Sequence, residues 1–149
     1  MFGYTQNGHI KFDIETTRVG CQKLRFLPVG LSLPAVPQWA VEFYSNFRVL
    51  PYHDYSKVPD GEVTWDYVYD EVFSYYGILY PIMSLVIPWG PDTLPNDPVR
   101  VAQFAAIMRQ AVDRKYLGTA LSMPITRELD EGKRKLVQRW CDLQMGGVA

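Results

Sequence analysis

Proline is the feature that most limits what this chain can form, because eleven of its 149 residues are proline. Proline fixes its own φ and lacks the N–H that a helix interior or a strand ladder needs. Pro34, Pro37 and Pro51 therefore forbid long regular elements in the first third of the chain. Eleven glycines add further turns, so we expect short elements rather than long uniform helices.

The first third alternates polar and apolar residues in two short runs, 9–14 and 22–27. Such alternation is typical of half-buried strands. The connection over residues 16–20 is short enough for a hairpin, so we predict that these two strands pair. A short helix is predicted over 37–44, and a further strand over 46–52.

From residue 60 the pattern becomes helical. Thr64 is a good N-cap residue, and apolar residues then recur at steps of three and four. Pro81 falls inside this stripe, which predicts a bent helix or two abutting helices. The residues predicted to form the buried stripe are Trp65, Val68, Val72, Tyr75, Tyr76, Leu79, Ile82, Met83 and Val86.

Two more helices are predicted in the second half. Asp97 followed by Pro98 is a strong start signal, and Gly118 is predicted to end that helix. The last helix is predicted to begin near Asp130 and to end at the glycines 146–147. It should carry Leu136, Val137, Trp140 and Leu143 towards the core.

These patterns predict an α+β fold that is mostly α. A Pro-rich N-terminal strand and turn region with a short hairpin precedes three to four packed helices. We predict a single domain over 1–149, strand- and loop-rich over 1–59 and helical over 60–145. The chain is 48% hydrophobic and 21% charged, which is ordinary for a folded domain.

Composition and missing motifs exclude several functions. The net charge of −1 gives no basic footprint for nucleic acid. The apolar stretch 77–89 contains two prolines and is shorter than the roughly 18 to 20 residues of a membrane span. No secretory signal is seen at the N-terminus. Neither a phosphate-binding loop nor a zinc pattern is present, so we expect no cofactor and no metal.

Cysteine usage bears on the compartment. Cys21 and Cys141 are the two cysteines of the chain, and two cysteines cannot build a disulfide framework. We interpret them as reduced thiols of a cytoplasmic protein. A single bridge between them stays open as an alternative.

One run suggests acid–base chemistry. His53 lies in the sequence Pro51-Tyr52-His53-Asp54-Tyr55, and histidine is the usual general acid or base near neutral pH. Adjacent residues of an extended segment point to opposite faces, so Asp54 is badly placed to orient His53. The alternative is a loop histidine bonded to the backbone. Tyr52 and Tyr55 flank His53 as candidate ligand-binding residues.

Aromatic residues give a second candidate site. Tyr69, Phe73, Tyr76 and Tyr80 follow one another at steps of four, three and four along one side of the predicted helix. Four such rings could line a pocket for a small aromatic or apolar ligand. The alternative is that they pack in the core or against a partner chain.

The last quarter of the chain resembles the closing segment of cytochrome c-like domains. The resemblance rests on Ser122–Lys133, with its Met-Pro pair, and on Leu136, Val137 and the Arg139–Asp142 run that contains Trp140. The chain departs from that family because it lacks the C-x-x-C-H haem-attachment motif. The resemblance therefore implies a haem-less helical relative, in which Met123 would pack rather than bind iron.

Charge is segregated along the chain. Residues 58–99 contain acids but no lysine or arginine, whereas bases outnumber acids from Arg100 onwards. These charges either pair within one chain or form a polar patch for a partner. We favour the second possibility, because the tyrosine-rich stripe next to the acids would supply an apolar centre.

The sequence therefore predicts a non-catalytic interaction or accessory module, a subunit or domain of a larger assembly. Its partner would be another protein or a second copy of the chain, with no nucleic acid and no membrane. The alternative is a small enzyme or apolar-ligand-binding protein with a tyrosine-lined pocket and His53 as the acid or base.

Overall fold

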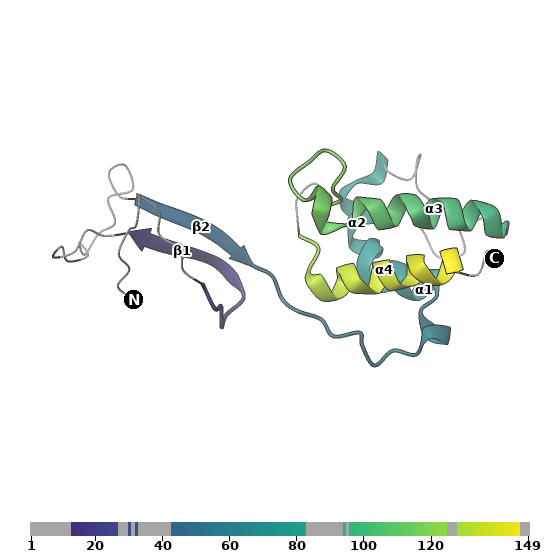
Figure 1. Cartoon of the computed structure of the whole chain (residues 1–149), viewed down its shortest axis with the longest axis horizontal. Coiled ribbons are helices and arrows are strands. Elements are labelled where there is room, and N and C mark those ends of the chain that lie inside the picture. The colour runs from purple at the N-terminus through teal and green to yellow at the C-terminus, as the bar shows by residue number, and fades with distance from the viewer. Residues whose placement is uncertain are drawn as a thin grey trace. The chain divides into compact units, whose positions relative to one another are not determined.

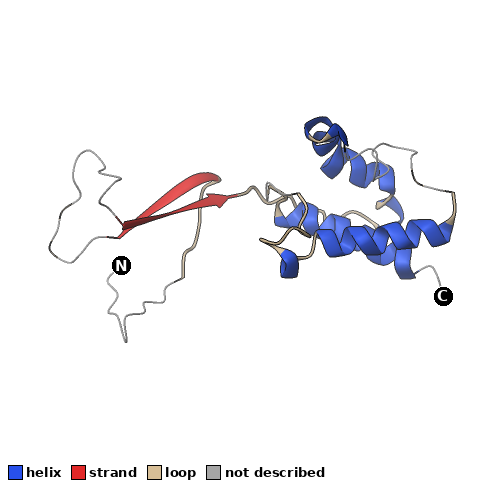
Figure 2. Cartoon of the chain, turned by 90° about the horizontal axis from the view of Figure 1, so that it is seen from above, coloured by secondary structure: helices blue, strands red, loops and turns tan. Residues whose placement is uncertain are grey.

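The computed structural model describes residues 13–26, 30, 32, 43–82, 94, 96–124 and 128–146. The chain divides into two compact units, Met1–Pro51 and Tyr52–Ala149. Figure 2 shows the described strands in the first unit and the described helices in the second. The fold is α+β and mostly helical, as the sequence predicted.

The boundary between the units lies after Pro51 rather than after residue 59. The reason is that residues 52–59 bond to the helices that follow. Tyr55 donates to Glu71, and its carbonyl accepts from Arg139. Whether the two units form one domain stays a prediction.

The first unit contains a two-stranded antiparallel sheet. Strand β1, Gly20–Phe26, pairs with β2, Phe43–Val49, so that Gly20 stands opposite Val49 (Figure 1). In an antiparallel pair, directly opposed residues share a face. One face presents the partly buried Leu24, Phe47 and Val49. The burial along β1 alternates from Gly20 to Leu24 and no longer alternates at Arg25 and Phe26.

In the described part of the chain β1 pairs with β2, which the sequence did not predict, and the predicted pairing with residues 9–14 stays a prediction. Residues 9–12 of the predicted first strand lie outside the described residues, and Asp13 and Ile14 are not in a strand. The predicted helix over 37–44 lies outside the description up to residue 42, and its last two residues belong to β2. The predicted strand over 46–52 is present but ends at Val49, ahead of Pro51, which has no N–H for a ladder.

The second unit begins with a helical run that changes its pitch. A 3₁₀ turn, Asp60–Glu62, precedes helix α1, Trp65–Val68, and a π-helical turn over Tyr69–Phe73 joins α1 to helix α2, Ser74–Leu79. Thr64 caps the run as predicted, because its hydroxyl accepts the Tyr67 N–H over 3.2 Å.

The π-helical turn changes which side of the run is buried. The Ser74 N–H donates to the carbonyl of Tyr69, five residues back, instead of to Asp70. Such a turn holds one residue more than an α-helical turn, so every later residue moves one position around the helix. The buried residue of the next turn is therefore Tyr76, with Tyr80 partly buried.

Among the described residues beyond Val72, the predicted buried stripe is confirmed only at Tyr76. Tyr75, Leu79 and Ile82 are exposed, and Met83 and Val86 lie outside the described residues. A continuous helix bent at Pro81 does not form, because α2 ends at Leu79. The alternative of two abutting helices stays a prediction, because residues 83–93 lie outside the described residues. Proline disfavours a helical residue before it, and Tyr80 leaves the helical region with φ −130° and ψ 63°.

Helix α3, Pro98–Ala111, begins as predicted. The Asp97 carboxylate accepts the Val99 N–H over 3.0 Å. The helix ends at Ala111, earlier than the predicted stop at Gly118, because the Asp113 side chain caps a separate 3₁₀ turn, Arg114–Tyr116. Gly118 instead has a φ of +92°, which glycine adopts readily, in the turn that follows.

Helix α4, Glu131–Gly146, also begins as predicted. The Asp130 carboxylate accepts the Lys133 N–H over 3.0 Å. Leu136, Val137 and Trp140 are buried, and Leu143 is partly buried. Helices α3 and α4 pack side by side (Figure 1).

An aromatic cluster forms the centre of the core of the second unit. The Trp65 ring lies 5.0 Å from the Trp140 ring, 5.5 Å from Phe73 and 5.4 Å from Phe104, measured between centroids. Trp65 comes from α1, Phe104 from α3 and Trp140 from α4. Through this cluster the three helices α1, α3 and α4 pack against one another.

Both cysteines are free thiols: Cys21 is exposed and Cys141 is buried. Burial raises the pKa of the Cys141 thiol to about 12, which suppresses its thiolate at neutral pH. Within the described ranges, no helix has the length and apolar character to cross a membrane.

Candidate functional site

His53 lies on the segment that leads into the helical unit, and its ring contacts the start of α4. Its Nδ1 atom is 2.8 Å from Oδ2 of Asp130. The His53 side chain is 48% exposed, whereas the Asp130 side chain is 4% exposed. A buried carboxylate thus orients an imidazole that solvent reaches, which is the arrangement of an oriented general base.

Asp130 is held firmly, because both of its carboxylate oxygens are engaged. Oδ1 accepts the Lys133 N–H at 3.0 Å, and Oδ2 faces His53. Sequence reasoning found Asp130 only as the start of a helix. It missed the contact with His53 because the two residues are 77 positions apart in the chain.

The sequence predicted that Asp54 is badly placed to orient His53, and in the structure Asp54 does not orient the His53 ring. Its carboxylate accepts the Ser56 N–H at 3.0 Å. This hydrogen bond to the backbone lowers the pKa of Asp54. Asp54 therefore closes a local turn, and the orienting carboxylate comes from Asp130 instead.

The two tyrosines beside His53 have different surroundings. The Tyr55 hydroxyl donates to Oε2 of Glu71 at 2.8 Å, and burial together with this contact raises the Tyr55 pKa. Tyr52 is exposed, and the Lys135 ammonium lies 5.9 Å from its ring centroid. Of the two, Tyr52 presents its ring to solvent, so it is the better placed to meet a ligand.

The four aromatic residues proposed as a ligand pocket, Tyr69, Phe73, Tyr76 and Tyr80, face the core. Phe73 and Tyr76 are buried, and Tyr69 and Tyr80 pack partly buried against the core cluster. This is the packing that the sequence interpretation named as the alternative. A ligand-binding role for these four residues stays a prediction.

The opposite side of α2 presents the exposed apolar residues Tyr75 (57%), Ile78 (81%) and Leu79 (44%), at positions i, i+3 and i+4. Ile82, which is 72% exposed, follows after the helix has ended at Leu79. We call these four residues the α2 stripe. Apolar residues at i, i+3 and i+4 are typical of a helix that lays an apolar side into a groove of a partner.

Two contacts connect the acidic stretch to the basic half within the chain. Arg139 Nε donates to Oδ1 of Asp60 over 2.6 Å, and the Lys133 ammonium donates to the carbonyl of Glu71 over 2.6 Å. The charges of Asp60 and Arg139 therefore pair inside the monomer, which at this place is the first of the two possibilities that the charge segregation left open, whereas Lys133 bonds to a backbone carbonyl.

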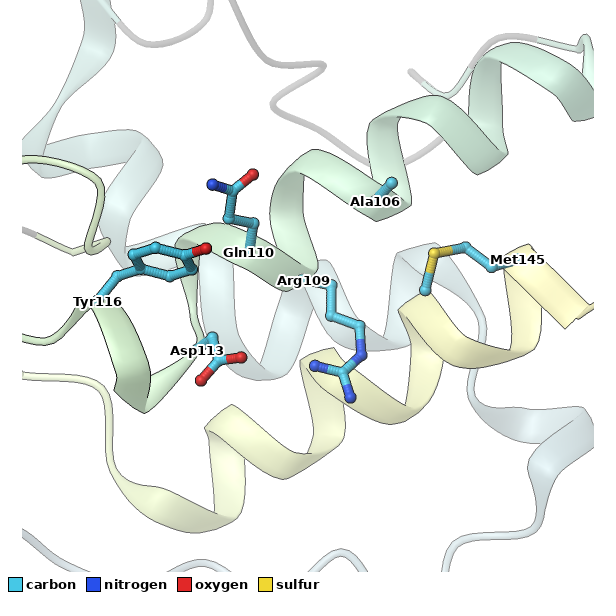
Figure 3. A pocket seen from close by; sticks show the side chains of 6 residues that line it. All are labelled: Ala106, Arg109, Gln110, Asp113, Tyr116 and Met145. Carbon is cyan, nitrogen blue, oxygen red and sulfur yellow. The ribbon is translucent and has the colours of Figure 1, made fainter.

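An open depression of about 370 Å³ lies on the surface of α3 and α4. It is lined by Ala106, Arg109, Gln110, Asp113, Tyr116 and Met145 (Figure 3). Arg109 reaches from α3 towards α4, where its Nε lies 2.6 Å from Oδ1 of Asp142. None of the residues predicted from the sequence as catalytic or ligand-binding lines this depression.

In the part of the chain that the structure describes, no three His, Cys, Asp or Glu side chains gather closely enough to hold a metal ion. No protein-family model, curated protein or solved structure matches the chain.

Proposed function

We propose that this chain is a non-catalytic interaction module, an accessory subunit whose contact surface is the α2 stripe. The observation that supports this most strongly is the exposure of Tyr75, Ile78 and Leu79 at i, i+3 and i+4 on one side of α2, with the exposed Ile82 shortly after the helix ends. Scattered exposed apolar residues are ordinary, whereas a contiguous apolar surface marks an interaction site.

The partner that we propose is a second copy of the chain. Across a twofold axis a surface meets itself, so any charge on it approaches its own copy. Tyr75, Ile78, Leu79 and Ile82 carry no charge at neutral pH, and no charged residue occurs between 74 and 82. The α2 stripe can therefore pair with itself without repulsion, and two unbridged thiols support a cytoplasmic location.

Sedimentation velocity over a range of concentrations tests this proposal. The double variant Ile78→Glu and Ile82→Glu places charges in the stripe and should sediment as a monomer where the wild type associates. Ile107→Glu is the matched control, because Ile107 is 69% exposed on α3, outside the stripe. A monomeric wild type, or equal effects of both variants, would contradict the proposal.

A second candidate function is supported by the His53–Asp130 contact. Here the chain would be a small acid–base enzyme or ligand-binding protein, in which His53 exchanges a proton with a bound small molecule. The exposed ring of Tyr52 and the Lys135 ammonium would border that ligand.

Native mass spectrometry of the purified chain tests the second candidate. A retained small molecule that His53→Gln releases and His9→Gln leaves bound would support it, because these are the two histidines of the chain. A protein that carries no small molecule, or that loses it equally in both variants, would count against it.

A further inference from the structure

Gly132, in the first turn of α4, lies directly against the backbone of His53. A Cβ atom at Gly132 would stand 1.6 Å from the His53 carbonyl oxygen and 2.6 Å from its carbonyl carbon. Both of these are backbone atoms, which cannot swing aside as the end of a flexible side chain can. A residue with a side chain at position 132 would therefore push the His53 backbone away from α4.

The same helical turn holds the ring of His53. Asp130 stands two residues before Gly132, and its Oδ2 contacts His53 Nδ1 at 2.8 Å. Backbone and ring of His53 are thus both held by α4, the first through close approach at Gly132 and the second through Asp130. The two contacts are made within the same turn, so a displacement of the His53 backbone from Gly132 would also move the ring relative to Asp130.

We propose that Gly132 and Asp130 are positioning residues that hold His53 in a single tautomer, with the proton on Nδ1 and the lone pair on Nε2. A carboxylate accepts hydrogen bonds and donates none, so Nδ1 must be the donor. In a neutral imidazole the other nitrogen is then the acceptor. This inference rests on the second candidate function and names the atom through which that site would work.

The consequence for proton transfer is direct. A proton taken from a bound molecule would add to Nε2 and produce an imidazolium, whose charge faces the Asp130 carboxylate. The same proton returns from Nε2 in the reverse step, so no further reactant is needed. Holding the correct tautomer in advance is the contribution that an orienting carboxylate makes to a catalytic histidine.

Long-range ¹H–¹⁵N correlation spectra of histidine-labelled protein test this inference. At about pH 9 an ordinary imidazole is neutral, and the spectra then identify which nitrogen carries the proton. We expect the Nδ1–H form for His53 in the wild type. Gly132→Ala should switch it to the Nε2–H form, as should Asp130→Ser, which keeps an N-capping hydroxyl but is too short to reach the ring.

Gly146→Ala is the matched control, because nothing lies within 4 Å of a Cβ built at Gly146. It should leave the His53 signals unchanged, and His9 serves as a reference inside every sample. If Gly132→Ala does not fold, as its amide spectrum would reveal, Asp130→Ser decides the question.

An Nε2–H form of His53 in the wild type would overturn the inference. So would an Nδ1–H form that persists in folded Gly132→Ala or in Asp130→Ser. The spectra need no ligand, so a chain that retains no small molecule but shows the Nδ1–H form loses the second candidate function and keeps the positioning roles of Gly132 and Asp130.

Discussion

The Ser74 N–H bonds to the carbonyl of Tyr69, five residues earlier, and the Ser74 hydroxyl donates to the carbonyl of Asp70 over 2.9 Å. The hydroxyl thus donates to the Asp70 carbonyl, to which the Ser74 N–H would donate in an α-helix. Because the turn holds one extra residue, Tyr76 packs in the core and Tyr75 faces solvent. The exposure of the α2 stripe therefore follows from the change of the Ser74 N–H acceptor from Asp70 to Tyr69.

The first prediction concerns the extra residue itself. Deleting Asp70, which is exposed, should convert the π-helical turn to a regular α-helical turn while leaving the same side chains in the core. We expect the free energy of unfolding to change by about 1 kcal/mol, the usual contribution of one hydrogen bond. Urea unfolding measures it.

Deleting Gln103 is the matched control, because Gln103 is also exposed but lies within the regular helix α3. That deletion would rotate the buried Ala105 and Met108 away from the core and should cost roughly 3 kcal/mol or more, as buried side chains do when they are removed. Equal costs for the two deletions would mean that the π-helical turn is not an inserted residue.

Much of the fold could be predicted from the sequence, because the hydrogen bonds that cap a helix start join residues close together in the chain. Thr64, Asp97 and Asp130 each accept an N–H two or three residues later, so a short window of sequence contains the whole signal. The π-helical turn has no comparable signal, since it depends on which side chains the core accepts. The pairing of β1 with β2 likewise has no local signal, because a long stretch of sequence separates the two strands.

Only part of the candidate site could be predicted from the sequence. His53 stands out as one of two histidines in the chain. Asp130 could not be matched to it, because the contact depends on how α4 packs against a segment 77 positions earlier. Gly132 likewise reads as an ordinary glycine until the backbone of His53 is placed against it.

The second prediction tests the aromatic cluster of the core. Trp140→Ala should lower the free energy of unfolding by roughly 3–5 kcal/mol, because truncation of a buried tryptophan leaves a cavity. Trp140 is almost fully buried and contacts Trp65 and Phe104. Tyr75→Ala, at an exposed site, should change it by about 0.5 kcal/mol or less. An unchanged melting temperature for Trp140→Ala would show that α4 does not dock through this residue.

The third prediction is a loss of stability at alkaline pH. Burial, with a smaller effect of Glu128, raises the pKa of the Tyr76 hydroxyl from 10.0 to about 12. The unfolded chain therefore loses this proton at lower pH than the folded chain, and the contribution of Tyr76 to stability is complete below pH 10 and declines towards pH 12.

Unfolding of wild type and Tyr76→Phe between pH 8 and pH 11 measures this contribution. The stability of the wild type relative to Tyr76→Phe should fall as the pH rises through this range, because phenylalanine has no proton to lose. Curves that stay parallel would mean that the Tyr76 hydroxyl titrates alike in the folded and the unfolded chain.

The fourth prediction separates the two thiols. At pH 8 an aromatic disulfide reagent should label Cys21, which is exposed, and spare Cys141, which is buried and whose pKa is raised to about 12. In the Cys21→Ser variant we expect labelling only after unfolding in denaturant. Fast labelling of native Cys21→Ser would show that the core opens at α4.

The most direct test of the proposed association is a cross-link at Ile78, in the middle of the α2 stripe. In a Cys21→Ser background, Ile78→Cys treated with a short bis-maleimide should yield a covalent dimer at micromolar protein concentration. Ile107→Cys, equally available on α3, should stay monomeric under the same conditions. Equal cross-linking of the two variants, or a monomeric Ile78→Cys, would contradict association through the α2 stripe.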